Sequence, residues 1–285
     1  MYLDNRPGVA GRVVSALGPT LRYWMQTEVH VYAFSVAANV LLSFFPFLIV
    51  SISLSRIFFD QQTTVGAIDF ALRDYFPDAL GRFLHNNLPE RRPVEFASMI
   101  LLLFTANGVF EPLEVALNRV WGISKNRSFL RNQVVSLLLI FACGGLALLS
   151  LAATAVHRGS LNGLAVDAWL SRIVLRIVSV PLAALILFLV YRYLPNELPH
   201  GRPPLNRVVP AAVGVGVLLE AMKLLMALLW PWMDLRIARE YGVFRYSVTL
   251  IFLGFMTSML VLAGAEWSAR GHRLDRVSAP VVRAS

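Results

Sequence analysis

Long runs without a charged side chain constrain this chain more than any other feature of its sequence. Residues Val31–Ser55 carry no Asp, Glu, Lys or Arg, and about 20 apolar residues let a helix cross a bilayer. Only 15% of all residues are charged, against about 25% in a soluble domain. The sequence therefore predicts an all-α, polytopic membrane protein. The predicted transmembrane domain, residues 31–266, contains six helices, at residues 31–55, 94–117, 132–157, 173–193, 208–233 and 246–266.

The segments outside these six spans are more polar. Residues 1–30 are predicted to form a tail and an N-terminal amphipathic helix in the membrane interface, because Leu17, Leu21 and Met25 recur at helical spacing. The connection 56–93, between spans one and two, contains two further amphipathic patterns, and we expect short helices there on the bilayer surface. Residues 267–285 form a basic tail.

The net charge of +9 comes mostly from arginines that are dispersed among the loops and tails. More of the basic residues fall on the side of the N-terminus, which predicts that both termini are cytoplasmic. Basic loops on that side also attract anionic phospholipid. Nucleic-acid binding would require the basic residues to gather on one face, so we do not expect it.

Polar residues inside the second predicted span are the first candidates for function. Asn107, Glu111, Glu114 and Asn118 follow each other at spacings of four, three and four residues, so a helix places them on one stripe. A carboxylate at membrane depth normally faces protein or a water-filled cavity. We take Glu111 as the stronger functional candidate of the two glutamates. Kinks are predicted in three spans, at Pro46, at Gly108 and Pro112, and at Pro181.

Glu220 and Lys223 interrupt the fifth predicted span at a spacing of three residues, so their side chains can meet on one helix face. One interpretation is an ion pair that neutralises itself so that the helix can insert. The other is a polar lining for the path of a substrate or a proton. The residues that we predict to line such a path are Asn39, Ser43, Asn107, Glu111, Glu220 and Lys223.

A second group of charged residues is predicted to anchor the cytoplasmic ends of the helices through salt bridges. It consists of Glu114, Arg119, Arg127, Arg131 and Glu266. The sequence indicates no metal site, cofactor site or catalytic group. Its only cysteine is Cys143, and its five histidines are isolated from one another.

Several stretches together resemble the YihY/BrkB family of bacterial inner-membrane proteins. The most specific are ALNRVWG at Ala116–Gly122 and the Gly264–Glu266 ending of the last span, and the resemblance covers about residues 20–270. It implies a six-span protein of the bacterial inner membrane, linked to serum resistance and to the handling of envelope lipid or lipopolysaccharide. The family once carried the label ribonuclease BN. That label belongs to soluble zinc enzymes whose clustered histidines are missing here, so we predict that the protein is not an enzyme.

Three functions remain open at this point. A transporter or flippase for a lipid or other envelope amphiphile accounts for the polar residues of the first, second and fifth spans. A structural or assembly factor that moves nothing accounts for the same residues as contacts between helices. A membrane-embedded hydrolase ranks third. The expected partners are membrane lipids, and association into a homo-oligomer is left open.

Overall fold

The described part of the chain is helical. The computed structural model describes residues 18–55, 92–123, 168–196, 198 and 201–278. It also describes residues 131, 134–136, 138, 139, 142, 143, 145 and 146. It contains no strand in these residues, only an isolated bridge between Leu198 and Gly201. Residues 1–17, most of the predicted connection 56–93, most of the third predicted span and Arg127 lie outside the described residues.

Five long helices form the described structure, and residues 18–24 add a short one before them. The long helices are α2 (Thr27–Ser55), α5 (Arg92–Val120), α7 (Ala168–Tyr193), α8 (Leu205–Tyr241) and α9 (Arg245–Ser278), with the short 3-10 helix η1 (Gly242–Phe244) before α9.

Two of these helices continue beyond the predicted spans. Helix α8 runs through Asp234 to Tyr241 and ends at Gly242, which adopts a positive φ of 52°. Helix α9 continues past Glu266 to Ser278, into the segment predicted as a basic tail. A charge marks where a chain leaves hydrocarbon, but it does not end a helix; a residue such as glycine at positive φ does.

Three helical segments of the described chain are long and apolar enough to cross a membrane, judged by length and composition. They are Thr27–Phe44, Leu205–Tyr241 and Arg245–Arg270, and Ser179–Tyr193 forms a shorter apolar helix. The structure therefore supports a membrane protein built from apolar helices, while the count of six spans stays a prediction. Exposed apolar side chains along α8, including Val209, Val213, Val217, Leu224 and Leu228, suit a face in contact with lipid.

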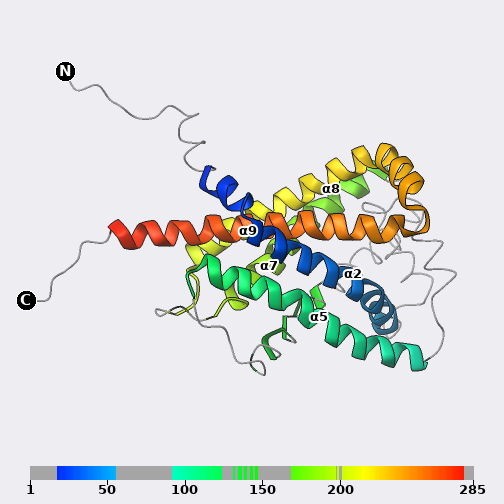
Figure 1. Ribbon diagram of the computed structural model, residues 1–285, viewed down its shortest axis with the longest axis horizontal. Helices are drawn as coiled ribbons and strands as arrows, with labels where there is room; N and C mark the ends of the chain where they lie inside the picture. The colour runs from blue at the N-terminus through cyan, green and yellow to red at the C-terminus, as the bar shows by residue number, and fades with distance from the viewer. Residues whose placement is uncertain are drawn as a thin grey trace, which may run out of the picture.

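Helix α9 lies at the centre of the arrangement (Figure 1). Helices α2 and α8 each pack against α9, while α5 packs on α2 and α7 packs on α8. The C-terminal end of α5 and the N-terminal end of α2 lie on the left side of the view, and α9 extends past both to its own C-terminal end at the far left. Residues 18–32, the end of α5 and the part of α9 that contains Glu266 and Arg270 form the walls of the pocket described below.

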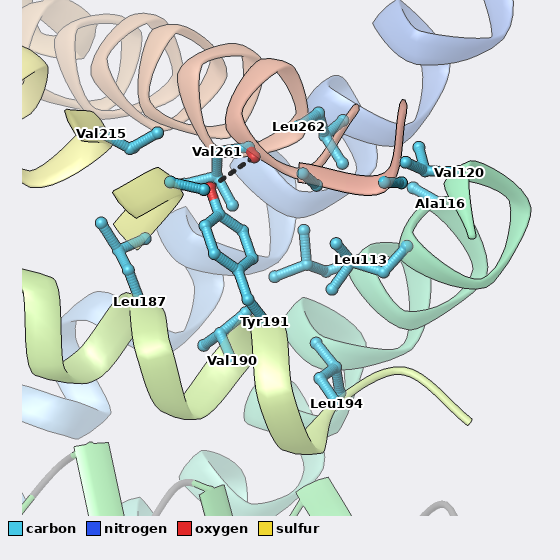
Figure 2. Packing of buried hydrophobic residues seen from close by; sticks show 14 of the residues in the cluster. Leu113, Ala116, Val120, Leu187, Val190, Tyr191, Leu194, Val215, Val261 and Leu262 are labelled. Carbon is cyan, nitrogen blue, oxygen red and sulfur yellow. Dashed lines mark hydrogen bonds between the residues drawn. The ribbon is translucent and has the colours of Figure 1, made fainter. Parts of the chain in front are cut away.

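The core of this arrangement surrounds Tyr191 of α7, whose side chain is 1% exposed. Figure 2 shows the ring between α5, α8 and α9, with its hydroxyl donating a 2.7 Å hydrogen bond to the carbonyl oxygen of Val261. A buried tyrosine needs such a partner, because an unpaired hydroxyl away from water is costly. Gly264 permits this contact, since a methyl group there would overlap Val215 and approach the Tyr191 hydroxyl to 2.7 Å.

Candidate functional site

The structure brings Glu220 and Lys223 together on α8, as their spacing permits. Lys223 Nζ lies 2.5 Å from Glu220 Oε1, and Ser179 of α7 donates a second hydrogen bond of 2.6 Å to the same oxygen. The side chains of Glu220 and Lys223 are only 12% and 20% exposed. We call these three residues the α7–α8 charge cluster. It places one carboxylate and one ammonium inside the predicted fifth span, with a hydroxyl from the neighbouring helix.

Gly216, one turn before Glu220, lets α7 approach α8 closely. A Cβ atom at Gly216 would lie 3.4 Å from the backbone nitrogen of Ala184. The α7 backbone therefore occupies the space beside Gly216. Small residues at a helix contact commonly allow such an approach in membrane proteins.

The polar candidates on α2 contact their own helix and α5. Asn39 Nδ2 donates to the Ser35 carbonyl at 2.9 Å, and Ser43 Oγ donates to the Asn39 carbonyl at 2.8 Å. Such bonds to the preceding turn satisfy a side chain without a partner from another helix. Asn39 also faces Gly108 of α5, where an added methyl group would overlap its amide. The structure thus places Asn39 against Gly108, two positions that the sequence analysis names separately. The side chain of Asn107 is not among those that the structure describes.

Of the described residues of the acidic stripe of α5, those nearer the end of the helix are buried. Glu111 is exposed, whereas Glu114 and Asn118 are 3% and 1% exposed. Asn118 Nδ2 lies 3.4 Å from Glu114 Oε1, and its Oδ1 accepts a 2.8 Å hydrogen bond from the backbone N–H of Asn196. The connection after α7 therefore covers the stripe only near the end of α5. We took Glu111 as the stronger candidate, but it is Glu114 that the protein encloses.

The prolines predicted to kink the spans lie inside continuous helices. Pro46, Pro112 and Pro181 are internal to α2, α5 and α7, and α8 contains Pro210 and Pro231 as well. Each proline removes one backbone donor from its helix. The helices nevertheless continue past these positions, and the bends themselves stay a prediction.

The predicted anchor residues Arg119 and Glu266 lie on the walls of one pocket of about 680 Å³, which we call the end pocket. It is enclosed by residues 18–32, the C-terminal end of α5 and the C-terminal part of α9. Its lining residues are Gly18, Pro19, Arg22, Tyr23, Gln26, Glu28, Val29, Tyr32, Arg119, Val120, Glu266 and Arg270. The predicted anchors are thus parts of a polar cavity at the end of the helices.

Glu266 organises one wall of the end pocket. Its Oε2 accepts a 2.7 Å hydrogen bond from Thr20 Oγ1, and its Oε1 lies 3.6 Å from Arg270 Nε. Arg270 Nη2 donates in turn to Thr20 Oγ1 at 2.9 Å. Burial and the nearby Glu266 carboxylate raise the pKa of Tyr23.

The lining of the end pocket also contains an ion pair that is open to solvent. Arg119 Nη2 lies 2.6 Å from Glu28 Oε2, and the two side chains are 61% and 51% exposed. A hydrogen bond with Tyr32 and the charge of Glu28 both raise the pKa of the Arg119 guanidinium. Arg131, another predicted anchor, lies elsewhere, on a smaller pocket of about 280 Å³ that it shares with Tyr193 and Arg202.

Sequence reasoning missed Tyr23, Glu28 and Arg270 of the end pocket, and it missed Thr20, which hydrogen-bonds to Glu266. Thr20 and Glu266 are 246 positions apart, and no periodicity in one sequence relates residues at that distance. Arg270 offered one local signal, because it follows Glu266 by four residues and shares its helix face. Among the described residues, no group of three or more His, Cys, Asp and Glu could hold a metal ion.

A comparison with protein families now gives a match along most of the chain. The family model described as virulence factor BrkB matches residues 20–280. No curated protein and no solved structure matches the chain. The match includes all the residues of the α7–α8 charge cluster and of the end pocket apart from Gly18 and Pro19.

Proposed function

The chain belongs to the virulence factor BrkB family and is a membrane protein with apolar helices, and from that premise we propose that it is a transporter or flippase. Its substrate in this proposal is a lipid or another amphiphile of the bacterial envelope. We place the protein in the inner membrane with both termini in the cytoplasm, as the distribution of basic residues predicts. The proposed role is not enzymatic.

The α7–α8 charge cluster is the observation that carries this proposal. Ionisable groups inside a membrane span are costly, and they commonly mark a path for a substrate or an ion. Lys223 and Glu220 belong to the same helix, whereas Ser179 belongs to α7. Separation of α7 and α8 would break the Ser179 hydrogen bond but not the ion pair, because Glu220 and Lys223 both belong to α8. The interface can therefore open toward a polar headgroup without leaving a bare charge in hydrocarbon.

Reconstitution into liposomes with a panel of fluorescently labelled lipids tests this proposal. We expect the wild type to move at least one lipid between leaflets and Glu220→Gln to slow that movement, because the neutral amide no longer compensates Lys223. Glu240→Gln is the matched control, since it removes an exposed carboxylate near the C-terminal end of the same helix. Equal rates for Glu220→Gln and Glu240→Gln, or no movement of any lipid, would refute the proposal.

A structural or assembly factor is the second candidate, and one observation favours it. Neither the end pocket nor the smaller Arg131 pocket of the described chain is lined by Glu111 or Glu220. In a static scaffold the α7–α8 charge cluster would only join two helices. Such a protein would move no lipid in the liposome assay, and Glu220→Gln would lower its thermal stability without any other effect.

A further inference from the structure

The end pocket contains more positive than negative groups. Its walls carry the guanidinium groups of Arg22, Arg119 and Arg270 against the carboxylates of Glu28 and Glu266. Arg119 and Arg270 already face those carboxylates. Arg22 makes no ion pair within the described part of the chain. One cationic group of the pocket is thus available to an anionic ligand without displacing a carboxylate.

The pocket has the size of a ligand site and a supply of neutral donors. Its volume of about 680 Å³ lies inside the range of roughly 300–1,000 Å³ that is usual for small-molecule sites. The hydroxyl groups of Tyr23 and Tyr32 belong to its lining. A tyrosine phenol is protonated at neutral pH, so Tyr23 can donate a hydrogen bond to an oxyanion.

Two apolar side chains, Leu21 in the helix at residues 18–24 and Met25 just after it, are exposed beside this pocket. Trp24 Nε1 donates a 2.8 Å hydrogen bond to the Met259 carbonyl, which holds the segment against α9. Leu21 and Met25, four residues apart, are 56% and 83% exposed. Apolar residues flanking a cationic group are typical of a segment that lies in the membrane interface. An acyl chain could then lie along Leu21 and Met25 while its headgroup reaches the pocket.

We propose that the end pocket binds a phosphate group, presented by the headgroup of a membrane lipid, with Arg22 as its first contact. Phosphate is the common anionic group of envelope lipids, and guanidinium groups bind it through paired, charge-assisted hydrogen bonds. The choice of a lipid as the ligand rests on the proposed transport function. The recognition of phosphate rests only on the pocket.

The two carboxylates, Glu28 and Glu266, determine whether Arg119 and Arg270 can contact the phosphate. The pair between Glu28 and Arg119 is largely exposed, and such pairs are weak because water screens them. A phosphate can therefore replace Glu28 as the partner of Arg119 at small cost. Glu266 is better shielded and also holds Thr20, so it remains the fixed wall of the site. Substitutions of Arg22 and of Glu28 should accordingly act in opposite directions.

Calorimetric titration of the full-length protein in a neutral detergent tests this inference. Dioctanoyl phosphatidic acid is the lipid probe, and glycerol 3-phosphate and inorganic phosphate supply the same chemistry without acyl chains. We expect Arg22→Gln to weaken binding of phosphatidic acid by about two- to fivefold, the range expected for one solvent-exposed ionic contact. Glu28→Gln should strengthen binding, because it frees Arg119 and removes a negative charge. Arg239→Gln, which removes an exposed arginine near the far end of α8, should change nothing.

The outcomes separate this inference from the transport proposal. Opposite effects of Arg22→Gln and Glu28→Gln support a phosphate site even if no lipid moves in liposomes. Equal affinity for glycerol 3-phosphate and phosphatidic acid would keep the phosphate site and overturn the lipid as its source. The inference is overturned entirely if none of the three probes binds, or if Arg22→Gln behaves like Arg239→Gln. It is overturned as well if Glu28→Gln weakens binding.

Discussion

Two acid–base pairs of this protein have nearly the same local construction but different surroundings. Glu220 pairs with Lys223 on α8 and accepts a hydrogen bond from Ser179 of α7. Glu266 pairs with Arg270 on α9 and accepts a hydrogen bond from Thr20. The four charged side chains are between 12% and 20% exposed. In each case, a carboxylate pairs with a cation on the same helix and accepts a hydrogen bond from a hydroxyl group of another segment.

The difference between the two pairs lies in what surrounds them. The α7–α8 charge cluster sits in an apolar span, where the α7 backbone closes over Gly216. The Glu266 pair forms one wall of an open cavity with further charges. A pair in the first setting lies inside the predicted span, so losing one partner strands a charge in apolar surroundings. A pair in the second setting can exchange a partner for water or a ligand. The same local pattern thus lies at a closed contact between two helices in one place and on the wall of a cavity in the other.

The largest loss of stability is expected for Lys223→Met, and this variant tests the proposed difference between the two pairs. It leaves Glu220 in the span with only Ser179 as a donor, and removing one partner of a buried pair costs about 3 kcal/mol or more. Arg270→Met should cost about 1 kcal/mol or less, because the end pocket admits water to Glu266. Thermal unfolding in detergent compares the two. The interpretation fails if the double variant Glu220→Leu with Lys223→Met proves less stable than Lys223→Met alone.

The second prediction concerns the glycine that precedes each pair. A methyl group at Gly264 would overlap Val215 and crowd the Tyr191 hydroxyl, so Gly264→Ala should destabilise by about 1–3 kcal/mol. A methyl group at Gly216 would meet the α7 backbone only at ordinary contact distance. Gly216→Ala should therefore stabilise by about 0.5 kcal/mol, because alanine favours a helix interior over glycine. Unfolding midpoints that shift in the same direction for both variants would contradict this contrast.

The third prediction tests whether the segment at residues 18–24 is part of the folded end. Trp24→Phe removes the hydrogen bond to the Met259 carbonyl but keeps an aromatic ring, and we expect a loss of about 1 kcal/mol. Limited proteolysis in detergent should then cut near residue 25 sooner than in the wild type. Phosphate binding at the end pocket should weaken in parallel. Unchanged cleavage would mean that the indole hydrogen bond does not hold this segment in place.

Apolar runs and local spacing predicted much of this fold, because both are properties of one segment. The uncharged run Val31–Ser55 lies inside helix α2, and the three-residue spacing of Glu220 and Lys223 predicted that the two could meet. The ends of α8 and α9 were harder to predict, because Asp234 and Glu266 change the polarity of the chain without ending the helix. Hydropathy describes the boundary of a membrane, whereas backbone geometry determines the end of a helix.

The end pocket could not be predicted, because its contacts join distant parts of the chain. Thr20 donates a hydrogen bond to Glu266, and Glu28 forms an ion pair with Arg119. In each case a long stretch of sequence separates the two partners. Periodicity assigns each residue to a face of its helix but says nothing about which segment covers that face. The stripe of α5 demonstrates the same limit: Glu111 and Asn118 are seven residues apart on one stripe, yet only Asn118 is covered, by the connection that contains Asn196.

The smallest predicted change in stability concerns Glu111 and tests whether burial distinguishes the acidic residues of α5. Glu111→Gln alters an exposed side chain, and we expect it to change the stability by less than about 0.5 kcal/mol. Glu114→Gln alters a side chain that is 3% exposed, so the same chemical change should be several times more costly there. Parallel unfolding of the two variants in detergent gives the comparison. If Glu111→Gln nevertheless slows lipid movement in liposomes while leaving stability unchanged, its carboxylate acts on the substrate path. If neither quantity changes, burial alone decides which acidic residue of α5 matters.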